Sequence, residues 1–337
     1  MPTSLRALRR ASGLSQADLA ARAGVTRQLV AAAEAGRHVP SVEAAIRIAR
    51  VLGVSVEEAF AEPPRAWAPA LDGGIEDGDL IVAARVGERL VIAPLRDELA
   101  RGAAWAAPDG IMESGTPRLF APASVDGFLV LGCEPALGIA SELLGRSGSR
   151  RLLALPATSG QALEALREGR CHAAVVHGPA GGLPRAPRGV RRLHLARWRV
   201  GLASPRPLTL ADALRGRRRL VQREASAASQ QALARAAAAH GAQVPSGPVA
   251  AGHLDAARLA QHSGAVAVTY EPAAARFGLA FLALETHIVE VWVAERFLDH
   301  PGLGALGELL SGRSLRERLA AIGGYDLEGI GARRDAA

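Results

Sequence analysis

Hydrophobic residues recur with helical spacing in the segment 15–36. Leu19 marks the apolar face of one predicted helix, and Leu29 and Val30 mark the apolar face of a second. Gly24 falls between them, where a glycine lets the chain turn sharply. The pattern therefore predicts two short helices that cross at a steep angle about a tight turn.

The same spacing continues on both sides of this segment. Leu5 and Leu8 predict a preceding helix, and Ser41 is a predicted cap for a helix that follows. These elements amount to roughly five short helices in about 62 residues. Pro63 and Pro64 cannot continue a helix, so we expect a domain boundary near residue 65.

Strand-like patterns begin after this boundary. The segment 79–95 contains two β-rich runs about Gly87 and Glu88, which predicts a hairpin that docks on the next domain. Farther on, strand and helix patterns alternate in two blocks, joined by extended segments at 198–203 and 284–293. Such alternation is typical of an α/β fold with a mainly parallel sheet, and the two blocks suggest two lobes around a cleft.

The predicted organisation follows these changes of pattern. The chain is expected to be a multidomain protein with an all-α helix-turn-helix domain at 1–62, a linker and β-hairpin at 63–114, a two-lobed α/β domain at 115–330 and a tail at 331–337. Strands of the α/β domain are expected at 127–131, 151–155, 173–176, 219–222 and 265–268. Its helices are expected at 135–144, 161–168 with Ser159 as cap, 208–214, 226–240, 272–277, 303–310 and 315–322.

Composition narrows the class of protein. The 337 residues, of which 49% are hydrophobic and 22% charged, allow two or three globular domains with sizeable cores. All of the basic residues are arginines, in the pattern that a GC-rich coding sequence produces, so the formal charge of +7 is weak evidence for a nucleic-acid partner. Residues 1–62 hold eight arginines against six acidic residues, so DNA binding there depends on where the charge is placed.

Neither the cysteines nor the apolar runs suggest export or a membrane. Cys133 and Cys171 are too few for a disulfide scaffold. No run approaches the ~18 apolar residues of a membrane span, and Arg9 and Arg10 stand where a signal peptide would be apolar. We therefore expect no membrane association and a cytoplasmic location.

Short motifs are spread over the whole helical domain. They are Leu14-Ser15-Gln16, Ala23-Gly24-Val25-Thr26-Arg27, Glu34 with Gly36-Arg37, Pro40-Ser41 and Leu52-Gly53-Val54-Ser55. Motifs in this order resemble the Xre family of DNA-binding domains, which includes Cro and the phage repressors. The resemblance implies a double-stranded DNA operator as partner, with the second helix of the unit in the major groove.

The resemblance also implies which residues contact DNA. Arg27 matches O6 and N7 of guanine, and Gln28 matches N6 and N7 of adenine. Gln16 would bind phosphate at the positive end of its helix, whereas Ala31 and Ala32 stand where polar base readers are common in the family. Alternatively, Arg27 is a solvent-exposed charge that contacts no base. The implied DNA contacts are Gln16, Thr26, Arg27, Gln28, Leu29, which would touch a thymine methyl, and Arg37, which would add a backbone contact.

A second series of motifs runs through the α/β region. It comprises Gly132-Cys133-Glu134-Pro135-Ala136, Ser159 with Ala162 and Leu163, His172-Ala173-Ala174-Val175-Val176-His177, Gly201-Leu202, Leu220-Val221-Gln222-Arg223 and Gly323-Gly324-Tyr325-Asp326. This order resembles the periplasmic-binding-protein-like domain of molybdate-responsive bacterial regulators, over roughly residues 115–330. The resemblance implies a type II periplasmic-binding-protein-like fold and a small-molecule effector, such as the oxyanion molybdate.

Two predicted helix starts offer hydrogen-bond donors to an oxyanion, Thr158 and Ser159 in one lobe and Ser226 and Ser229 in the other. Helix capping explains each hydroxyl as well. Relatives carry Gly-Ser-Gly-Thr-Arg where this chain has Ser226-Ala227-Ala228-Ser229-Gln230, which favours another small molecule or a domain kept for dimerisation or partner binding. The candidate ligand contacts are Cys133, Thr158, Ser159, His177, Gln222, Arg223, Ser226, Ser229, Tyr270 and Glu271.

Metal binding and catalysis find little support in the sequence. Cys171, His172 and His177 are close together, but positions 172 and 177 of one strand face opposite sides of a sheet. The chain has no helical HxxxH or CxxC spacing, no GxSxG elbow and no P-loop. Ser159 with either histidine is a conceivable dyad, but hydrogen bonding to a ligand or the core explains these residues better. No metal, cofactor or catalytic residue is therefore predicted.

These observations together predict a ligand-responsive transcriptional regulator that binds an inverted repeat as a homodimer. Repression is favoured over activation, because occupying a promoter needs no further contact. One alternative is an enzyme or sensor linked to molybdenum cofactor metabolism. Another is a constitutive DNA-binding protein whose second domain serves protein contacts.

Overall fold

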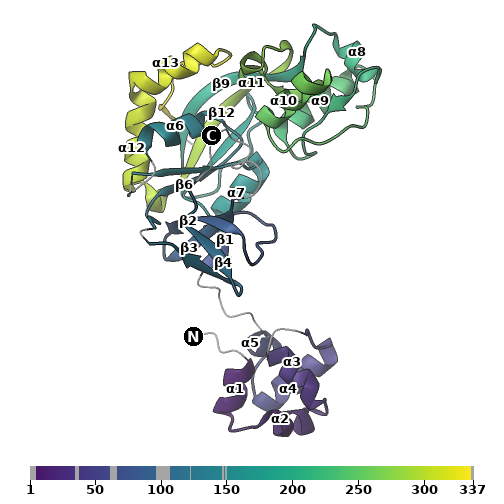
Figure 1. Ribbon diagram of the computed structural model, residues 1–337, viewed down its shortest axis with the longest axis vertical. Coiled ribbons are helices and arrows are strands. Elements are labelled where there is room, and N and C mark those ends of the chain that lie inside the picture. Colours follow the sequence, from purple (N-terminus) through teal and green to yellow (C-terminus); the bar gives the residue numbers. More distant parts are fainter. Residues whose placement is uncertain are drawn as a thin grey trace. The chain divides into compact units, whose positions relative to one another are not determined.

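The computed structural model describes residues 5–34, 38–60, 67–95, 107–121, 123–145, 148 and 150–334 (Figure 1). The chain divides into two compact units, Met1–Trp67 and Ala68–Ala337. None of the described helices has the length and apolar character that crossing a membrane requires.

The N-terminal unit consists, in its described part up to Phe60, of helices and the loops between them. Leu5, Leu19, Val30 and Ile48 are buried and pack together at its centre. Each comes from a different helix, so this small core holds the unit together through the hydrophobic effect. The helices are α1 (Leu5–Ala11), α2 (Gln16–Ala23), α3 (Arg27–Glu34), α4 (Val42–Leu52) and α5 (Val56–Phe60).

Local signals set the ends of α2 and α3. The Ser15 hydroxyl accepts a hydrogen bond from the Asp18 amide at 3.1 Å, and the Asp18 carboxylate accepts one from the Ser15 amide at 3.0 Å. This capping box starts α2, and Gly24 ends it with φ at +60°. The Thr26 hydroxyl accepts the Leu29 amide at 3.1 Å and starts α3. The predicted helix-turn-helix is therefore confirmed in its two helices and its turn.

A small antiparallel sheet opens the second unit, in the strand order β1-β3-β2-β4-β5. The predicted hairpin is present, with Gly87 at φ +63° in its turn. Val82 and Val91 of this hairpin pack with Leu129 and Leu163 of the α/β domain, so the hairpin docks there as expected. The strands are β1 (Trp67–Pro69), β2 (Leu80–Val86), β3 (Arg89–Pro94), β4 (Gly110–Glu113) and β5 (Thr116–Leu119).

The α/β domain is built on a sheet in the order β10-β11-β9-β12-β8-β6-β7, with β13 paired to β9. Its two central strands, β9 and β12, are 15 residues long and pair along most of their length. One end of this pair joins β6, β7 and β8, and the other joins β10 and β11, which gives two lobes. The strands are β6 (Phe128–Leu131), β7 (Leu152–Leu155), β8 (Ala173–Pro179), β9 (Val190–Ser204), β10 (Leu220–Val221), β11 (Val266–Tyr270), β12 (Ala280–Ala294) and β13 (Arg333–Arg334).

Helices cover both lobes. In Figure 1, α8, α9 and α10 surround the lobe of β10 and β11, whereas α6, α12 and α13 lie on the other lobe. The helices are α6 (Ala136–Leu144), α7 (Ser159–Arg167), α8 (Leu210–Leu214), α9 (Ala228–Ala239), α10 (His253–Ser263), α11 (Glu271–Arg276), the 3-10 turn η1 (Glu295–Phe297), α12 (Pro301–Ser311) and α13 (Arg313–Ile322).

Two predictions about this domain are wrong, and one helix was missed. The sheet is mixed, because the two long strands return antiparallel to each other and to their neighbours, and parallel pairing is confined to β6 with β7 and β8 and to β10 with β11. Thr158, not Ser159, caps α7, because its hydroxyl accepts the Gln161 amide at 3.3 Å. Helix α10 was not predicted, because its buried face is made of alanines, which give a weak apolar signal.

Candidate functional site

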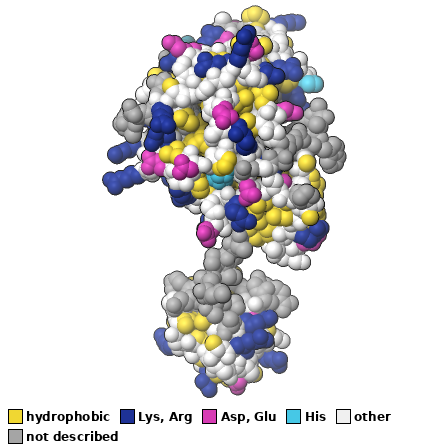
Figure 2. All heavy atoms as spheres, turned by 90° about the vertical axis from the view of Figure 1, so that its left-hand side faces the viewer, with side chains coloured by type: hydrophobic (Ala, Val, Ile, Leu, Met, Phe, Trp, Pro, Cys, Tyr) yellow, Lys and Arg dark blue, Asp and Glu magenta, His cyan; other side chains and the backbone are white. Residues whose placement is uncertain are grey.

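The N-terminal unit presents a surface hollow between α2 and α3. It is lined by Gln16, Thr26, Arg27, Gln28 and Ala31. The side chains at positions 26, 27 and 28 are exposed. Figure 2 shows arginine side chains gathered on part of this unit's surface. The hollow therefore brings together four of the residues predicted to contact DNA.

Gln16 is held by a buried acid at the end of α3. Its Nε2 donates to the Glu34 carboxylate at 2.9 Å. The same carboxylate accepts two hydrogen bonds from the Arg9 guanidinium, at 2.5 and 3.1 Å, and the Glu34 side chain is fully buried. This network links α1, α2 and α3 and fixes the Gln16 amide before any DNA contact.

The remaining predicted DNA contacts differ in their surroundings. Thr26 caps α3, so its hydroxyl already has a partner within the protein. Leu29 is half-buried and packs against the core of the N-terminal unit. Arg37 lies outside the described residues. The assignment of these residues to DNA contacts stays a prediction.

In the α/β domain, Cys133 and His177 meet directly. Cys133 follows β6, and Gly132 before it has no room for a side chain, because a Cβ there would lie 2.5 Å from Val175 Cβ. His177 lies in β8, and its Nε2 is 2.9 Å from Cys133 Sγ. The close approach of the chain at Gly132 therefore places the thiol beside the imidazole.

A chain of hydrogen bonds runs behind His177. Its Nδ1 is 2.9 Å from Nδ1 of His287 on β12, and His287 Nε2 is 3.1 Å from the Glu285 carboxylate. The Arg235 guanidinium donates two hydrogen bonds to the same carboxylate, at 2.8 Å each. This ion pair holds the pKa of Glu285 below its usual value, so the carboxylate is ionised and accepts from His287.

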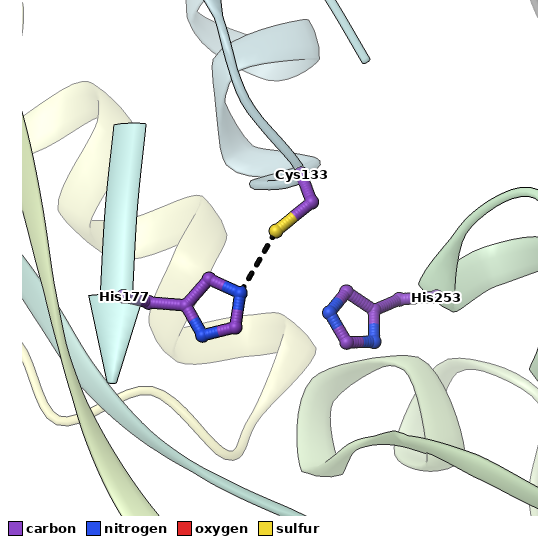
Figure 3. A group of neighbouring side chains, drawn as sticks. All are labelled: Cys133, His177 and His253. Atoms are coloured by element: carbon purple, nitrogen blue, oxygen red, sulfur yellow. Dashed lines mark hydrogen bonds between the residues drawn. The ribbon is translucent and has the colours of Figure 1, made fainter. Parts of the chain in front are cut away.

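His253 reaches the same place from the other lobe, at the start of α10. Figure 3 shows its ring facing Cys133 and His177, with one ring nitrogen directed toward them. The His253 and His177 ring centroids are 6.0 Å apart, and Trp198 lies 4.6 Å from the His177 ring. His253 Nδ1 is buried and has no hydrogen-bond partner among the described residues.

Arg223 and Tyr270 complete this group. The Arg223 Nη1 donates to the Ala250 carbonyl at 2.6 Å, and the charge of Arg223 acts on Cys133, His177 and His253. The Tyr270 ring lies 4.8 Å from that of His253. We call this group the junction cluster, because its members come from both lobes and the strand between them. It consists of Cys133, His177, Trp198, Arg223, His253 and Tyr270.

Burial sets the protonation of the junction cluster. It raises the pKa of the Cys133 thiol to about 12, against the opposing pull of Arg223. Burial also lowers the pKa values of His177 and His253 well below the usual value, and repulsion from neighbouring positive groups, Arg223 among them, lowers them further. The thiol and both imidazoles are therefore uncharged at neutral pH.

A carboxyl group closes one side of the cluster. Glu134 accepts hydrogen bonds from Trp198 Nε1 at 2.7 Å and from the Tyr325 hydroxyl at 2.8 Å. The Tyr325 hydroxyl is in turn 3.1 Å from that of Tyr270. Burial raises the pKa of Glu134, although these hydrogen bonds and one from the Ala136 amide oppose the rise. The network joins the two lobes with the C-terminal segment.

The other candidate ligand residues lie apart from this group or have partners of their own. Ser159 accepts the His177 amide at 3.2 Å, and Ser229 is buried, with no partner for its hydroxyl among the described residues. Gln222 donates to the Pro245 carbonyl at 2.8 Å and accepts from Gln230. The rest are held locally: Thr158 caps α7, Ser226 bonds to Glu224, and Glu271 pairs with Arg199.

Sequence reasoning missed four residues of this region. Glu134 and Tyr325 lie in quoted motifs, Trp198 begins a predicted crossing segment, and His253 has no motif. The sequence could have pointed to Glu134 and Tyr325, because both lie in these motifs. The histidine gives no local signal, because α10 brings it to the site only through the fold.

The cysteine and histidines weighed for a metal in the sequence separate in the structure. Cys171 lies against the Ala162 carbonyl, 4.0 Å from its Sγ. His172 accepts the Leu129 amide at 2.9 Å and stacks on Phe128. Only His177 reaches the junction cluster, as the opposite faces of positions 172 and 177 require.

The fold and these sites define a class: a helix-turn-helix domain joined to a two-lobed α/β domain of the periplasmic-binding type. The chain belongs to the PBP superfamily domain family, whose profile matches residues 140–311, and residues 5–58 match the helix-turn-helix family. It is therefore a DNA-binding helix-turn-helix transcriptional regulator with a PBP-like ligand-binding domain.

Curated relatives match the N-terminal unit. An uncharacterized HTH-type transcriptional regulator of Methanothermobacter thermautotrophicus is 53% identical over 53 residues, which is 16% of this chain and 77% of that protein. The uncharacterized HTH-type transcriptional regulator YgzD of Bacillus subtilis is 40% identical over 60 residues, which is 18% of this chain and 91% of that protein.

Solved structures resemble the α/β domain at low identity. A putative phosphate ABC transporter substrate-binding protein of Clostridium perfringens, with bound phosphate, has a TM-score of 0.46 and 11% identity, covering 59% of this chain and 98% of that one. The bromide-bound regulatory domain of HypT from Salmonella typhimurium has a TM-score of 0.43 and 14% identity, covering 57% and 94%.

Proposed function

We propose that this regulator changes its affinity for a DNA operator when a small ligand binds at the junction cluster. Repression is the proposed mode, because a bound protein blocks a promoter without any further contact. We propose no catalytic role for the cluster. The ligand acts only if it binds one state of the protein more tightly than the other.

This proposal rests on four candidate ligand residues that lie close together in the structure. Cys133, His177, Arg223 and Tyr270 were chosen from separate stretches of the sequence, and they lie in one cluster drawn from both lobes. All but Cys133 are buried, at 2 to 4% exposure. A ligand must therefore enter when the lobes open, and closing them around it couples binding to a change of conformation.

The resemblance makes molybdate the first ligand to test. Arg223 would supply positive charge, and the Ser229 hydroxyl, which is only 1% exposed, needs a partner. Against this, Ala227 and Ala228 stand where relatives have glycines, and their Cβ atoms restrict how closely the backbone can approach an anion.

The test combines thermal unfolding with operator binding in the full chain. Operators come from a selection with random DNA, and molybdate, phosphate, sulfate and a metabolite library are screened as ligands. A true ligand at a hundred times its dissociation constant adds about 2.7 kcal/mol of stability and changes operator affinity.

Tyr270→Ala should abolish both effects, whereas Tyr325→Phe, which keeps the ring, should retain binding. If ligands alter neither stability nor operator affinity, the protein is a constitutive DNA binder.

We propose a homodimer as the DNA-bound form. A single small domain buries too little surface for specific binding, and a twofold dimer matches an inverted repeat whose half-sites lie about one helical turn apart. The exposed apolar side chains Val39, Val42 and Ile46 support this, at 87%, 77% and 42% exposure, because they cluster on and next to α4.

A further inference from the structure

Three metal-ligating side chains converge in the junction cluster. Cys133, His177 and His253 each offer one ligand atom, and these atoms all lie within 4.8 Å of one another (Figure 3). They come from the turn after β6, from β8 and from the start of α10. One thiol and two imidazoles are the donors that thiophilic and borderline transition metals prefer.

Hydrogen bonding fixes which nitrogen of His177 carries the proton. The ionised Glu285 can only accept, so His287 donates to it from Nε2 and keeps a lone pair on Nδ1. His177 must then donate from its own Nδ1 to His287. Its Nε2 consequently has a free lone pair, which faces the Cys133 thiol at 2.9 Å.

This arrangement is the one that a ligating histidine needs. A metal-bound imidazole binds through one nitrogen and donates from the other to a partner that holds the ring in place. The chain from Glu285 through His287 supplies that partner for His177. In Figure 3 the ring nitrogen of His253 that faces Cys133 and His177 is Nε2. Its Nδ1 points away from them and has no hydrogen-bond partner among the described residues, so no outer partner is seen for this ring.

Charge and the number of donors favour a monovalent ion. A Cys133 thiolate with two neutral imidazoles carries a charge of −1, which a singly charged ion cancels. A doubly charged ion would leave a net positive charge buried next to Arg223, which is costly in a low-dielectric interior. Three donors also satisfy Cu(I) by themselves, whereas zinc takes four and needs a water as the fourth ligand where the protein supplies three.

We propose that Cys133, His177 and His253 bind Cu(I) and join the two lobes through it. The Cys133 S–H bond breaks, a copper–sulfur bond forms, and the proton passes to solvent; copper enters as Cu(I), so no electron is transferred. The inference deepens the proposed function and rests on it, since it names the ligand for the same site. The expectation of no metal was argued from Cys171, His172 and His177, and only His177 of these takes part in the proposed site.

Cu(I) binding is measured anaerobically in the full chain by competition with a coloured Cu(I) chelator. The wild type should bind one ion per chain and show thiolate-to-copper absorption in the ultraviolet. Cys133→Ser should weaken binding by at least the ~10- to 100-fold that losing an outer-shell partner costs, and should abolish the absorption. Cys171→Ser, which removes the other thiol, should bind like the wild type.

A second pair of variants distinguishes the loss of a metal ligand from misfolding. His253→Gln should weaken Cu(I) binding as Cys133→Ser does, whereas His262→Gln, an exposed position on the same helix, should not. Circular dichroism confirms that each variant is folded. Equal affinity in wild type and Cys133→Ser, or no binding by the wild type, overturns the site. Tighter binding of Zn(II) than Cu(I) by the same ligands overturns the choice of ion.

Operator binding with and without Cu(I) separates this inference from the proposed function. If Cu(I) fails to bind while an oxyanion changes operator affinity, the copper site is wrong and the proposed function stands. If Cu(I) binds at the three residues and no ligand changes operator affinity, the site stands and the proposed function is wrong. A Cu(I)-dependent change in operator affinity that Cys133→Ser abolishes supports both.

Discussion

Glu34 shows how one residue sets the geometry of the DNA-binding unit. Its carboxylate lies at the end of α3 and binds Arg9 of α1 and Gln16 of α2. Burial alone would raise the pKa of Glu34, but the hydrogen bonds from these two side chains outweigh it and hold the pKa below its usual value. The ionised form is therefore part of the folded structure.

Acidification should loosen the N-terminal unit through this carboxylate. A folded-state pKa below the unfolded value means that the stabilisation is complete above the unfolded pKa and is lost as pH falls through the folded one. Glu34→Gln should lower the stability of the unit by about 1–3 kcal/mol at neutral pH. It should also make that stability change less with pH in the acid range. Hydrogen exchange of α1 to α3 against pH measures both effects.

Glu43→Gln is the matched control, since its exposed pair with Arg47 should contribute only about 0.3–0.5 kcal/mol. If Glu34→Gln leaves exchange unchanged across the acid range, the buried carboxylate does not hold the helices together.

Arg27 and Gln16 should act differently on DNA. Arg27→Ala should relax the base preference at one operator position by about 1–3 kcal/mol, because an exposed guanidinium at the start of α3 can read a guanine edge. Gln16→Ala should weaken binding evenly over all sequences, because a phosphate contact carries no base information. Binding-site selection with each variant distinguishes the two roles. An unchanged preference in Arg27→Ala removes this residue from the base readers.

At the scale of elements, the turn from β6 into α6 positions the junction cluster. It carries Cys133 and Glu134, and it depends on the close approach of Gly132 to β8. Pushing this turn away from β8 should separate the thiol from His177, because the turn carries Cys133 and β8 carries His177.

Gly132→Ala should therefore damage the fold and the site. A Cβ at 2.5 Å from Val175 Cβ forces the strands apart, which should cost about 1–3 kcal/mol. Gly138→Ala, in α6, is the control: its Cβ meets nothing within 4 Å, and alanine should stabilise the helix by about 0.5–1 kcal/mol. Urea unfolding of both variants measures the difference. Equal stability of the two would show that the approach at Gly132 is not tight.

At the scale of the whole molecule, ligand sensing depends on how the two lobes are joined. Strands β9 and β12 run through both lobes, so opening must bend these strands while the Glu134, Trp198 and Tyr325 network breaks or rearranges. Under the proposed function, a ligand at the junction cluster would shift the equilibrium between open and closed states.

The oligomeric state is also a property of the whole molecule, and a substitution at the proposed dimer interface tests it. Val42→Glu should convert a dimer into a monomer and weaken binding to an inverted repeat far more than to a single half-site, because a buried charge disrupts an apolar interface. Leu254→Glu, at an exposed apolar position of the other unit, should leave both unchanged. Analytical ultracentrifugation and operator titration are the measurements. A dimer that survives Val42→Glu places the interface elsewhere.

The sequence by itself determined most of the local structure. The cap at Ser41, the turn at Gly24 and the hairpin at Gly87 follow from neighbouring residues, because capping and positive φ depend on residues close in the chain. The order of motifs also indicated the two-lobed domain. Among candidate ligand residues, it indicated Cys133, His177, Arg223 and Tyr270, which the structure brings together.

Only the tertiary structure decided what those residues face. Thr158 and Gln222 have hydroxyl and amide groups suited to a ligand, yet the fold uses them for a cap and for bonds within one lobe. His253 carries no sequence signal and joins Cys133 and His177 from more than 70 positions away in the chain. Convergence of this kind is decided by how strands and helices pack, because the hydrophobic core fixes where each element lies.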